Sequence, residues 1–251
     1  MLLALLGALA IGLSLGLLGS GGSILTVPVL HYLLGQPEKL AICGSLLVVG
    51  VIATAALIPH ARHGQVDWPK VFWFGLPGML GAWTGASLAK MVPGVVQMAL
   101  FAAVMLAAAS RMLSRSTLER VSLQPRRIAV IAGGAGVGLL SGLVGVGGGF
   151  LIVPALVLLA GIGMSAAVGT SLAIISLNAF TGFARSVSVL KDLGLELDWP
   201  VLVAVSAIGI AGSLSGSRLG RKLPQATLRR LFGLFLLAMG AFIVVDIAGG
   251  R

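Results

Sequence analysis

Two glycine clusters carry the residues best placed to do chemistry. They are Gly19-Ser20-Gly21-Gly22-Ser23 and Gly145-Val146-Gly147-Gly148-Gly149, each inside an apolar stretch. Glycine costs about 1 kcal/mol relative to alanine within a helix, so clusters of this density predict a helix break. The N–H groups that start the next helix, together with the helix dipole, can bind an anion without a cationic side chain. The predicted anion-binding residues are Gly19, Ser20, Gly21, Gly22, Ser23, Gly145, Gly147, Gly148 and Gly149.

Four polar residues inside apolar spans extend this set: Ser45, Thr170, Ser171 and Asn178. The three hydroxyls fit a structural role equally well, because Ser and Thr can satisfy themselves on helix carbonyls. Asn178 is the stronger candidate, since an amide in hydrocarbon needs a partner.

Other glycines and two histidines have a plainer interpretation. We attribute Gly78, Gly81 and Gly85 to close helix packing. Packing alone does not explain the two clusters, which are dense, duplicated and followed by a proline. His60 and His63 flank Arg62, and we expect all three in a solvated loop.

Composition sets the environment of these residues. Apolar residues make up 58% of the 251 and charged ones 10%, with a mean hydropathy of +1.10. A soluble domain carries roughly 25% charged residues. Stretches of about 20 residues are long enough to cross a hydrocarbon core. They lie at 40–59, 70–89, 95–113, 166–185, 199–219 and 228–247. The chain is therefore predicted to be an all-α polytopic membrane protein.

An internal repeat organises the chain. The segment Gly16–Pro28 recurs as Gly142–Pro154, at an offset of 126 residues. After an insertion of five residues in the second copy, Asp67-Trp68-Pro69 matches Asp198-Trp199-Pro200. Gly78, Gly81 and Gly85 then match Gly209, Gly212 and Gly216. We predict a first membrane repeat at 1–113, a basic cytoplasmic linker at 114–127 and a second membrane repeat at 128–251.

The glycine clusters divide the start of each repeat into the pieces 1–18 and 24–34, then 128–144 and 150–161. Because most are too short to cross comfortably, we favour hairpins dipping to mid-membrane, each followed by three transmembrane helices. Two full passes per stretch stay open. Either arrangement inverts the second repeat and leaves both termini outside.

The basic residues support the hairpins, because cytoplasmic loops carry the Lys/Arg excess. The hairpin topology places twelve of the 17 on one side and five on the other, whereas single spans give ten against seven. The twelve are Arg62, Lys70, Arg111, Arg115, Arg120, Arg126, Arg127, Arg218, Arg221, Lys222, Arg229 and Arg230. We assign the net charge of +10 to orientation and contact with anionic lipid, and expect no nucleic-acid partner.

Several chemistries lack their motifs. The sequence contains no P-loop, no dinucleotide-binding glycine pattern after a strand, and no nucleophile–base constellation of an enzyme. Cys43 is alone and no His/Cys cluster occurs, so we expect neither a metal nor another cofactor. No Asp or Glu lies in the middle of a span, so proton coupling through a buried carboxylate has no candidate.

The paired glycine motifs, the valine–proline pairs that follow and Gly169-Thr170-Ser171-Leu172 resemble the TauE/SafE family. It is also called the sulfite exporter or toluene-sulfonate uptake permease family. The resemblance covers nearly the whole chain. It implies a secondary transporter of sulfite, sulfonates or related organic anions in the bacterial inner membrane. Ser20, Ser23 and Cys43-Gly44-Ser45 depart from the second copy, and substrate identity stays open.

Three hypotheses follow. We favour an anion transporter that works by alternating access, over a passive anion channel or a non-transporting membrane scaffold. The expected partners are a small anion and the lipid bilayer. The sequence leaves open the transport direction, the coupling ion and whether the chain forms a homo-oligomer.

Overall fold

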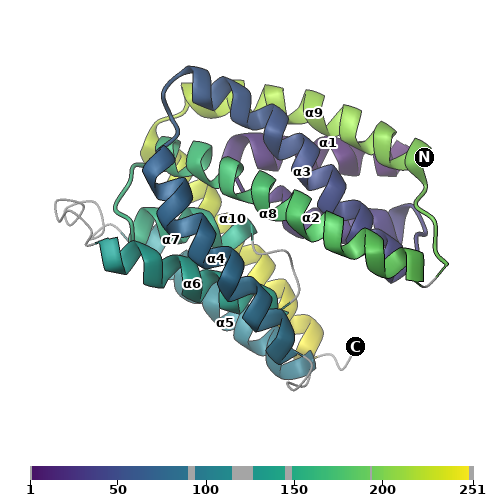
Figure 1. The fold of residues 1–251 in the computed structure, drawn as a ribbon. Coiled ribbons are helices and arrows are strands. Elements are labelled where there is room, and N and C mark those ends of the chain that lie inside the picture. Colours follow the sequence, from purple (N-terminus) through teal and green to yellow (C-terminus); the bar gives the residue numbers. More distant parts are fainter. Residues whose placement is uncertain (1, 90–93, 115–126, 145–148, 193, 249–251) are drawn as a thin grey trace. The chain divides into compact units, whose positions relative to one another are not determined.

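A computed structural model describes residues 2–89, 94–114, 127–144, 149–192 and 194–248. Within these ranges the regular structure is helical (Figure 1). The elements are α1 (Leu2–Leu18), α2 (Gly22–Pro28), η1 (Val29–Leu33), α3 (Glu38–Arg62), α4 (Trp68–Ala89), α5 (Gly94–Leu113), α6 (Arg127–Val144), α7 (Gly149–Leu158), α8 (Met164–Asp192), α9 (Trp199–Lys222) and α10 (Gln225–Ala248).

Four helices are long and apolar enough to cross a membrane. They are α3, α8, α9 and α10, each with an apolar stretch of 21 to 24 residues. The other two expected spans lie in α4 and α5, which have 22 and 20 residues. Large apolar side chains remain exposed on these helices, including Phe72 at 59% and Val203 at 64%. Such surfaces suit contact with lipid, so the chain is a multi-pass membrane protein.

The first glycine cluster interrupts a helix where predicted, since α1 ends at Leu18 and α2 begins at Gly22. In the second copy, α6 ends at Val144 and α7 begins at Gly149, and residues 145–148 of the cluster lie outside the described residues. α2, of 7 residues, runs directly into the π-helical turn η1, of 5 residues. Twelve residues span about 18 Å, short of a hydrocarbon core of about 30 Å. The returning arm is therefore too short to cross by itself.

The arm α2–η1 folds back along α1. A Cβ built on Gly22 would lie 2.4 Å from the carbonyl oxygen of Ile11, and one on Gly7 would lie 3.0 Å from Val29. Later residues of the arm thus meet earlier residues of α1. This antiparallel packing forms the helical hairpin expected for the first repeat.

The helices group into two compact units. Unit 1 contains Met1–Asp67 and Val168–Lys222, and unit 2 contains Trp68–Ala167 and Leu223–Arg251. Unit 1 therefore holds α1, α2, η1, α3, most of α8 and α9; unit 2 holds α4 to α7 and α10. Each unit takes helices from both sequence repeats, so neither repeat packs only on itself.

Each unit contains one glycine seam, meaning a line of glycines along which two helix backbones touch. In unit 1, a Cβ on Gly12 of α1 would lie 2.0 Å from the Gly209 carbonyl oxygen of α9. In unit 2, a Cβ on Gly138 of α6 would lie 1.9 Å from the Gly78 carbonyl oxygen of α4. Gly12 and Gly138 are 126 residues apart and Gly78 and Gly209 are 131 apart, so the repeat builds the same contact twice.

The second pair of equivalent contacts is close as well. A Cβ on Gly81 would lie 2.2 Å from the Ala135 carbonyl oxygen, and one on Gly212 would lie 2.6 Å from that of Leu9. These distances leave no room for a side chain. The packing interpretation of Gly78 and Gly81 is confirmed.

Repeat-related helices also pair with each other inside each unit. In unit 1, α3 lies beside α8 (Figure 1), with Leu46 near Gly182 and the Thr54 Oγ1 atom 2.6 Å from the Ser176 Oγ atom. In unit 2, α5 meets α10, with Leu113 near Gly233 and Leu106 near Gly240. In both pairs, the numbers of the contacting residues rise along one helix and fall along the other. Both pairs are therefore antiparallel.

The seams predict a position-specific effect of alanine. We expect Gly138→Ala to lower the thermal midpoint of the detergent-solubilised protein, since overpacking costs typically about 1–3 kcal/mol. Gly136→Ala is the matched control in the same helix, because nothing lies within 4 Å of its added Cβ. The measurement is a thermal unfolding series of both variants against the wild type. Equal midpoints for the two variants would contradict the seam geometry.

Candidate anion-binding site

Gly19 forms the turn that closes α1. Its N–H donates to the Leu15 carbonyl at 2.8 Å, and its φ of +78° lies in the left-handed region that favours glycine. An added Cβ would lie 2.7 Å from the Ser171 Oγ atom and 2.9 Å from the Val168 Cα atom. Glycine is therefore required here both by the backbone conformation and by the approach of α8.

The first turns of α8 hold this break in place. The Ser171 hydroxyl lies 2.8 Å from the Val168 carbonyl and 3.1 Å from the Gly19 carbonyl, within reach of donating to either. The Thr170 hydroxyl accepts a hydrogen bond from the Asp67 backbone N–H at 3.0 Å. Thr170 and Ser171 have no exposed surface. The structure thus brings the predicted residues Gly19, Thr170 and Ser171 together at one buried junction.

The hydroxyls of the first cluster and of α3 bond to nearby backbone. Ser20 and Ser23 are buried, and Ser23 donates to the Ser20 carbonyl at 2.9 Å. Ser45 donates to the Ile42 carbonyl at 2.7 Å. Gly21 has φ −62° and ψ −29° and supplies no side-chain cap to α2. The first N–H groups of a helix lack partners within that helix, and those of α2 are the donors that the sequence prediction assigned to an anion.

Ser45 and Asn178 lie away from the junction. Ser45 precedes His60 by fifteen residues, about 22 Å along α3, and Asn178 follows Ser171 by seven, about 10 Å along α8. The Asn178 Oδ1 atom is buried with no hydrogen-bond partner in the described structure. In the second cluster, Gly149 is buried at the start of α7, whereas Gly145, Gly147 and Gly148 lie outside the described residues.

The break lies beside the end of α9. The Ser217 hydroxyl donates to the Gly16 carbonyl at 3.3 Å, and a Cβ on Gly220 would lie 3.4 Å from Leu17. α9 ends at Lys222, so Gly19 is level with its last turn. The midpoint of α9 faces Gly12, about 10 Å below the break. The break is thus closer to one end of the helices of unit 1 than the mid-membrane position expected from the sequence.

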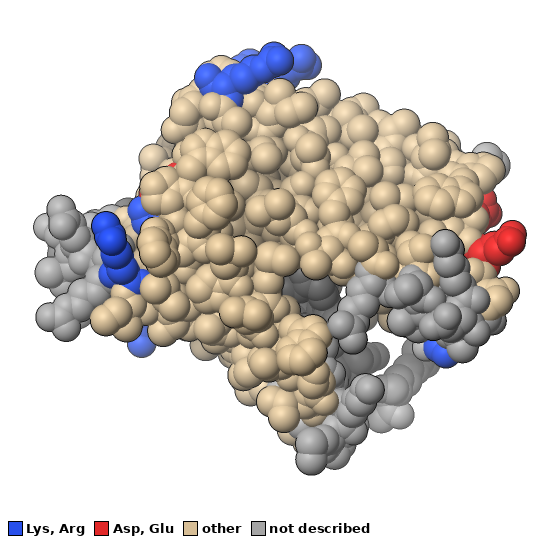
Figure 2. Space-filling model, viewed as in Figure 1, with Lys and Arg blue, Asp and Glu red and all other residues tan. Residues whose placement is uncertain are grey.

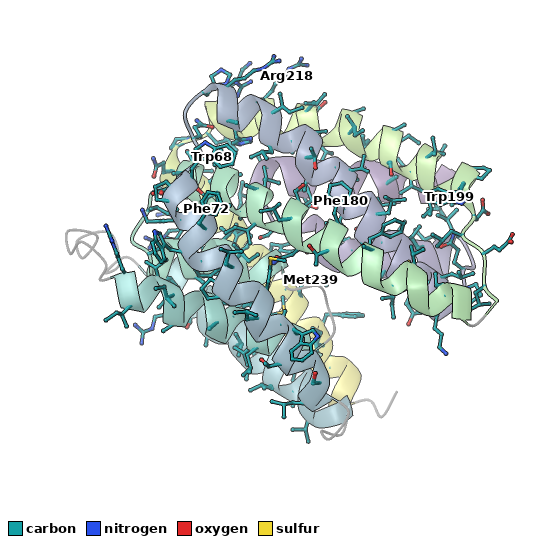
Figure 3. The ribbon with its side chains drawn as sticks, in the orientation of Figure 1. Trp68, Phe72, Phe180, Trp199, Arg218 and Met239 are labelled. Carbon is teal, nitrogen blue, oxygen red and sulfur yellow. The ribbon has the colours of Figure 1, made fainter. Side chains whose placement is uncertain are left out.

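This end of unit 1 is cationic. Four exposed basic side chains gather at the ends of α3 and α9: Arg62, Arg218, Arg221 and Lys222. Figure 2 shows their blue patch, and Figure 3 labels Arg218 there, with Trp199 at the opposite end of α9. Glu196, Asp198 and Lys39 lie toward that opposite end. A patch of one sign raises the local concentration of ions of the other sign, so it would collect anions near the break.

His60 differs from the sequence prediction. α3 continues through Pro59 to Arg62, and His60 is only 4% exposed, with its Nδ1 atom 2.9 Å from the Ala56 carbonyl oxygen. Its expected place in a solvated loop is wrong, whereas His63, at the end of the helix, is exposed as expected. A proline inside a span often ends a helix, but here the helix continues through Pro59. His60 follows the buried Ala56 by four residues, so helical spacing places both side chains on the same buried face.

The Asp-Trp-Pro segment of the second copy caps a helix. The Asp198 side chain accepts a hydrogen bond from the Val201 N–H at 3.2 Å at the start of α9. Trp68 and Trp199 are each about half exposed at the first residues of α4 and α9. Such positions suit tryptophan at a membrane interface.

Helix lengths, apolar surfaces and the buried break define the class as multi-pass membrane proteins with a discontinuous helix. The family model for sulfite exporter TauE/SafE matches residues 3–243. The chain belongs to this family, whose members are membrane transporters and not enzymes.

Relatives match along almost their whole length. A probable membrane transporter protein of Xylella fastidiosa (strain Temecula1) is 34% identical over 93% of this chain and 91% of its own. Proteins described in the same words from Methanocaldococcus jannaschii and Bacillus subtilis are each 26% identical. They cover 94% and 98% of this chain, and 93% and 97% of their own lengths. No solved structure matches the chain.

The break predicts a second pair of alanine variants. Gly19 and Gly35 both have positive φ, +78° and +67°, but nothing lies within 4 Å of a Cβ added to Gly35. We expect Gly35→Ala to lose about 1–2 kcal/mol from the left-handed backbone alone. Gly19→Ala should lose a further 1–3 kcal/mol, roughly, from its contacts with α8. Thermal unfolding tests the order, and equal losses would contradict the close approach of Ser171.

Proposed function

We propose that the chain is a secondary transporter of sulfite or a related sulfur-containing or organic anion. The anion binds to backbone N–H groups at the two glycine breaks and crosses by alternating access. The observation that carries this proposal is the buried junction of Gly19 with Thr170 and Ser171, in a chain of the TauE/SafE family. Unwound backbone is tolerated inside a membrane where it is buried in protein or lines a cavity.

The second half of the proposal is an inverted repeat. Its support is the antiparallel packing of the repeat-related pairs α3–α8 and α5–α10. Helices related by a twofold axis in the membrane plane run in opposite directions through the bilayer. The equivalent seams, α1–α9 and α4–α6, agree with this symmetry. Gly145, Gly147, Gly148 and Gly149 would then contribute the second break, and alternating access would exchange the conformations of the two repeats.

We place the protein in the bacterial inner membrane with both termini outside. The support is the cationic end of unit 1, since cytoplasmic loops carry the Lys/Arg excess. In this orientation the patch of Arg62, Arg218, Arg221 and Lys222 collects anions from the cytoplasm beside the break. That arrangement favours export.

The first test is radiolabelled sulfite counterflow in proteoliposomes, with sulfate, taurine, sulfoacetate and acetate as competitors. We expect saturable exchange that falls at least about tenfold in Gly21→Leu, because a buried side chain would occupy the anion's approach to the N–H groups. Gly136→Leu introduces the same side chain at an open position and is the control.

The alternatives give different results in the same vesicles. A passive anion channel would show flux without counterflow. A scaffold would show neither flux nor stabilisation by sulfite. Normal exchange in Gly21→Leu would remove the break as the binding site.

Orientation gives a separate prediction. Single cysteines introduced as Lys39→Cys and Arg218→Cys in a Cys43→Ala background mark the two ends of unit 1. We expect a membrane-impermeant maleimide to label Lys39→Cys on intact spheroplasts and Arg218→Cys only after permeabilisation. Both native side chains are exposed, so access to protein surface does not distinguish them. The reverse labelling pattern would overturn the orientation and the export preference.

A further inference from the structure

We propose that His60 is the proton-binding residue of the transport cycle. Its imidazole takes up one proton when an anion binds at the Gly19 break and releases it when the anion leaves. The inference rests on the proposed function and names the coupling ion, which the family and the sequence leave open. α1, α2 and residues 164–184 of α8 contain no Asp, Glu, Lys, Arg or His, so the charged groups near the break come from the ends of α3 and α9 and from Asp67 in the loop after α3.

The hydrogen bonding of His60 assigns its tautomer. Its Nδ1 atom lies 2.9 Å from the Ala56 carbonyl oxygen, and a carbonyl only accepts hydrogen bonds. Nδ1 therefore carries the proton of the neutral ring, and Nε2 is the atom that gains or loses the second proton. Imidazole is the side chain whose ordinary pKa lies closest to neutral pH, which suits a group that must load and unload in every cycle.

His60 and the break meet the same turn of α8. A Cβ on Gly169 would lie 3.2 Å from the His60 Cβ atom, while a Cβ on Gly19 would lie 2.9 Å from the Cα atom of the preceding residue, Val168. His60 and Gly19 therefore approach consecutive residues of one turn of α8. His60 is 4% exposed, so water screens a charge on its side chain less than it would at the surface.

Gln65 adds an acceptor at this junction. Its backbone carbonyl oxygen would lie 2.2 Å from a Cβ on Gly169, and its N–H donates to the His60 carbonyl at 2.9 Å. Its side-chain Oε1 atom is buried with no hydrogen-bond partner in the described structure. A protonated imidazole offers a new donor, and Gln65 holds an unused acceptor in the adjacent loop.

The charged groups around His60 make its proton depend on the anion. Arg62 and His63 follow it on α3, Arg221 on α9 donates to the His63 Nε2 atom at 2.7 Å, and Asp67 lies in the loop beyond. The His63 Nδ1 atom lies 2.6 Å from the Pro59 carbonyl oxygen. The cations oppose another positive charge at His60, whereas an anion at the break stabilises it. By linkage, the proton then strengthens anion binding equally.

The step balances without another reactant. Nε2 takes one proton from the aqueous side that faces the site, and the imidazolium gives it to the opposite side after the conformational change. No covalent bond to the anion forms and nothing is oxidised. Proton and anion move in the same direction.

The test is isothermal titration of sulfite into the purified full-length protein, in two buffers of different protonation enthalpy. His60→Asn removes Nε2 but keeps an N–H donor near the Ala56 carbonyl, and His63→Gln is the exposed control. We expect the wild type and His63→Gln to take up about one more proton per bound sulfite than His60→Asn. Any proton that sulfite itself takes up is the same for the wild type and both variants, so it cancels when their proton numbers are compared.

Equal proton numbers in the three proteins would overturn the role of His60 while leaving the transporter intact. If the wild type bound neither sulfite nor sulfate, taurine, sulfoacetate or acetate, the proposed function would be overturned and this inference with it. His60→Gln serves if the asparagine variant does not fold. In proteoliposomes containing a pH-sensitive dye, net sulfite flux through His60→Gln should move about one proton fewer per anion than the wild type. An unchanged proton count would again overturn the role of His60.

Discussion

In hydrocarbon, every backbone N–H and C=O group must find a partner within the protein, and the rest of this structure follows from that constraint. A break in a helix exposes such groups, so it survives only when other segments surround it. At Gly19 the N–H bonds to Leu15 and the carbonyl lies within hydrogen-bond distance of the Ser171 hydroxyl. In the proposed function, an anion uses the N–H groups at the start of α2. The same contacts that bury the break would then also enclose the proposed site.

Glycine serves two purposes in this arrangement. At Gly19 it allows a backbone conformation, whereas at Gly12 and Gly138 it allows two helices to touch. The seams matter to the breaks because α1 ends at the first break and α6 ends just before the second cluster. A helix that ends inside a membrane protein needs a firm partner along its length. Backbone contact with α9 supports α1, and backbone contact with α4 supports α6. Close packing of this kind matters in lipid, because the hydrophobic effect does not drive helices together there.

Much of the fold was predictable because its signals are local. The length of the apolar stretches predicted the helices. The density of glycines predicted the first break, which lies between Leu18 and Gly22. The repeat identified which glycines are equivalent, but not that Gly12 meets Gly209, since partners across a seam follow from three-dimensional packing. Ser45 was predicted as a site residue because the sequence shows that a hydroxyl lies inside a span but not which part of the fold it faces. His60 was misplaced because a proline inside a helix resembles its end.

The chemistry of the site fits the needs of transport better than a cationic pocket would. A site must bind strongly enough to capture its anion and weakly enough to release it on the other side. A buried arginine at the break would hold a desolvated anion too firmly, and would remain an unpaired buried charge after release. Backbone donors bind without adding net charge, and the described cations of unit 1 gather at the helix ends, where they attract without trapping. The proton proposed for the His60 imidazole would then supply a charge that is present with the anion and absent after it leaves.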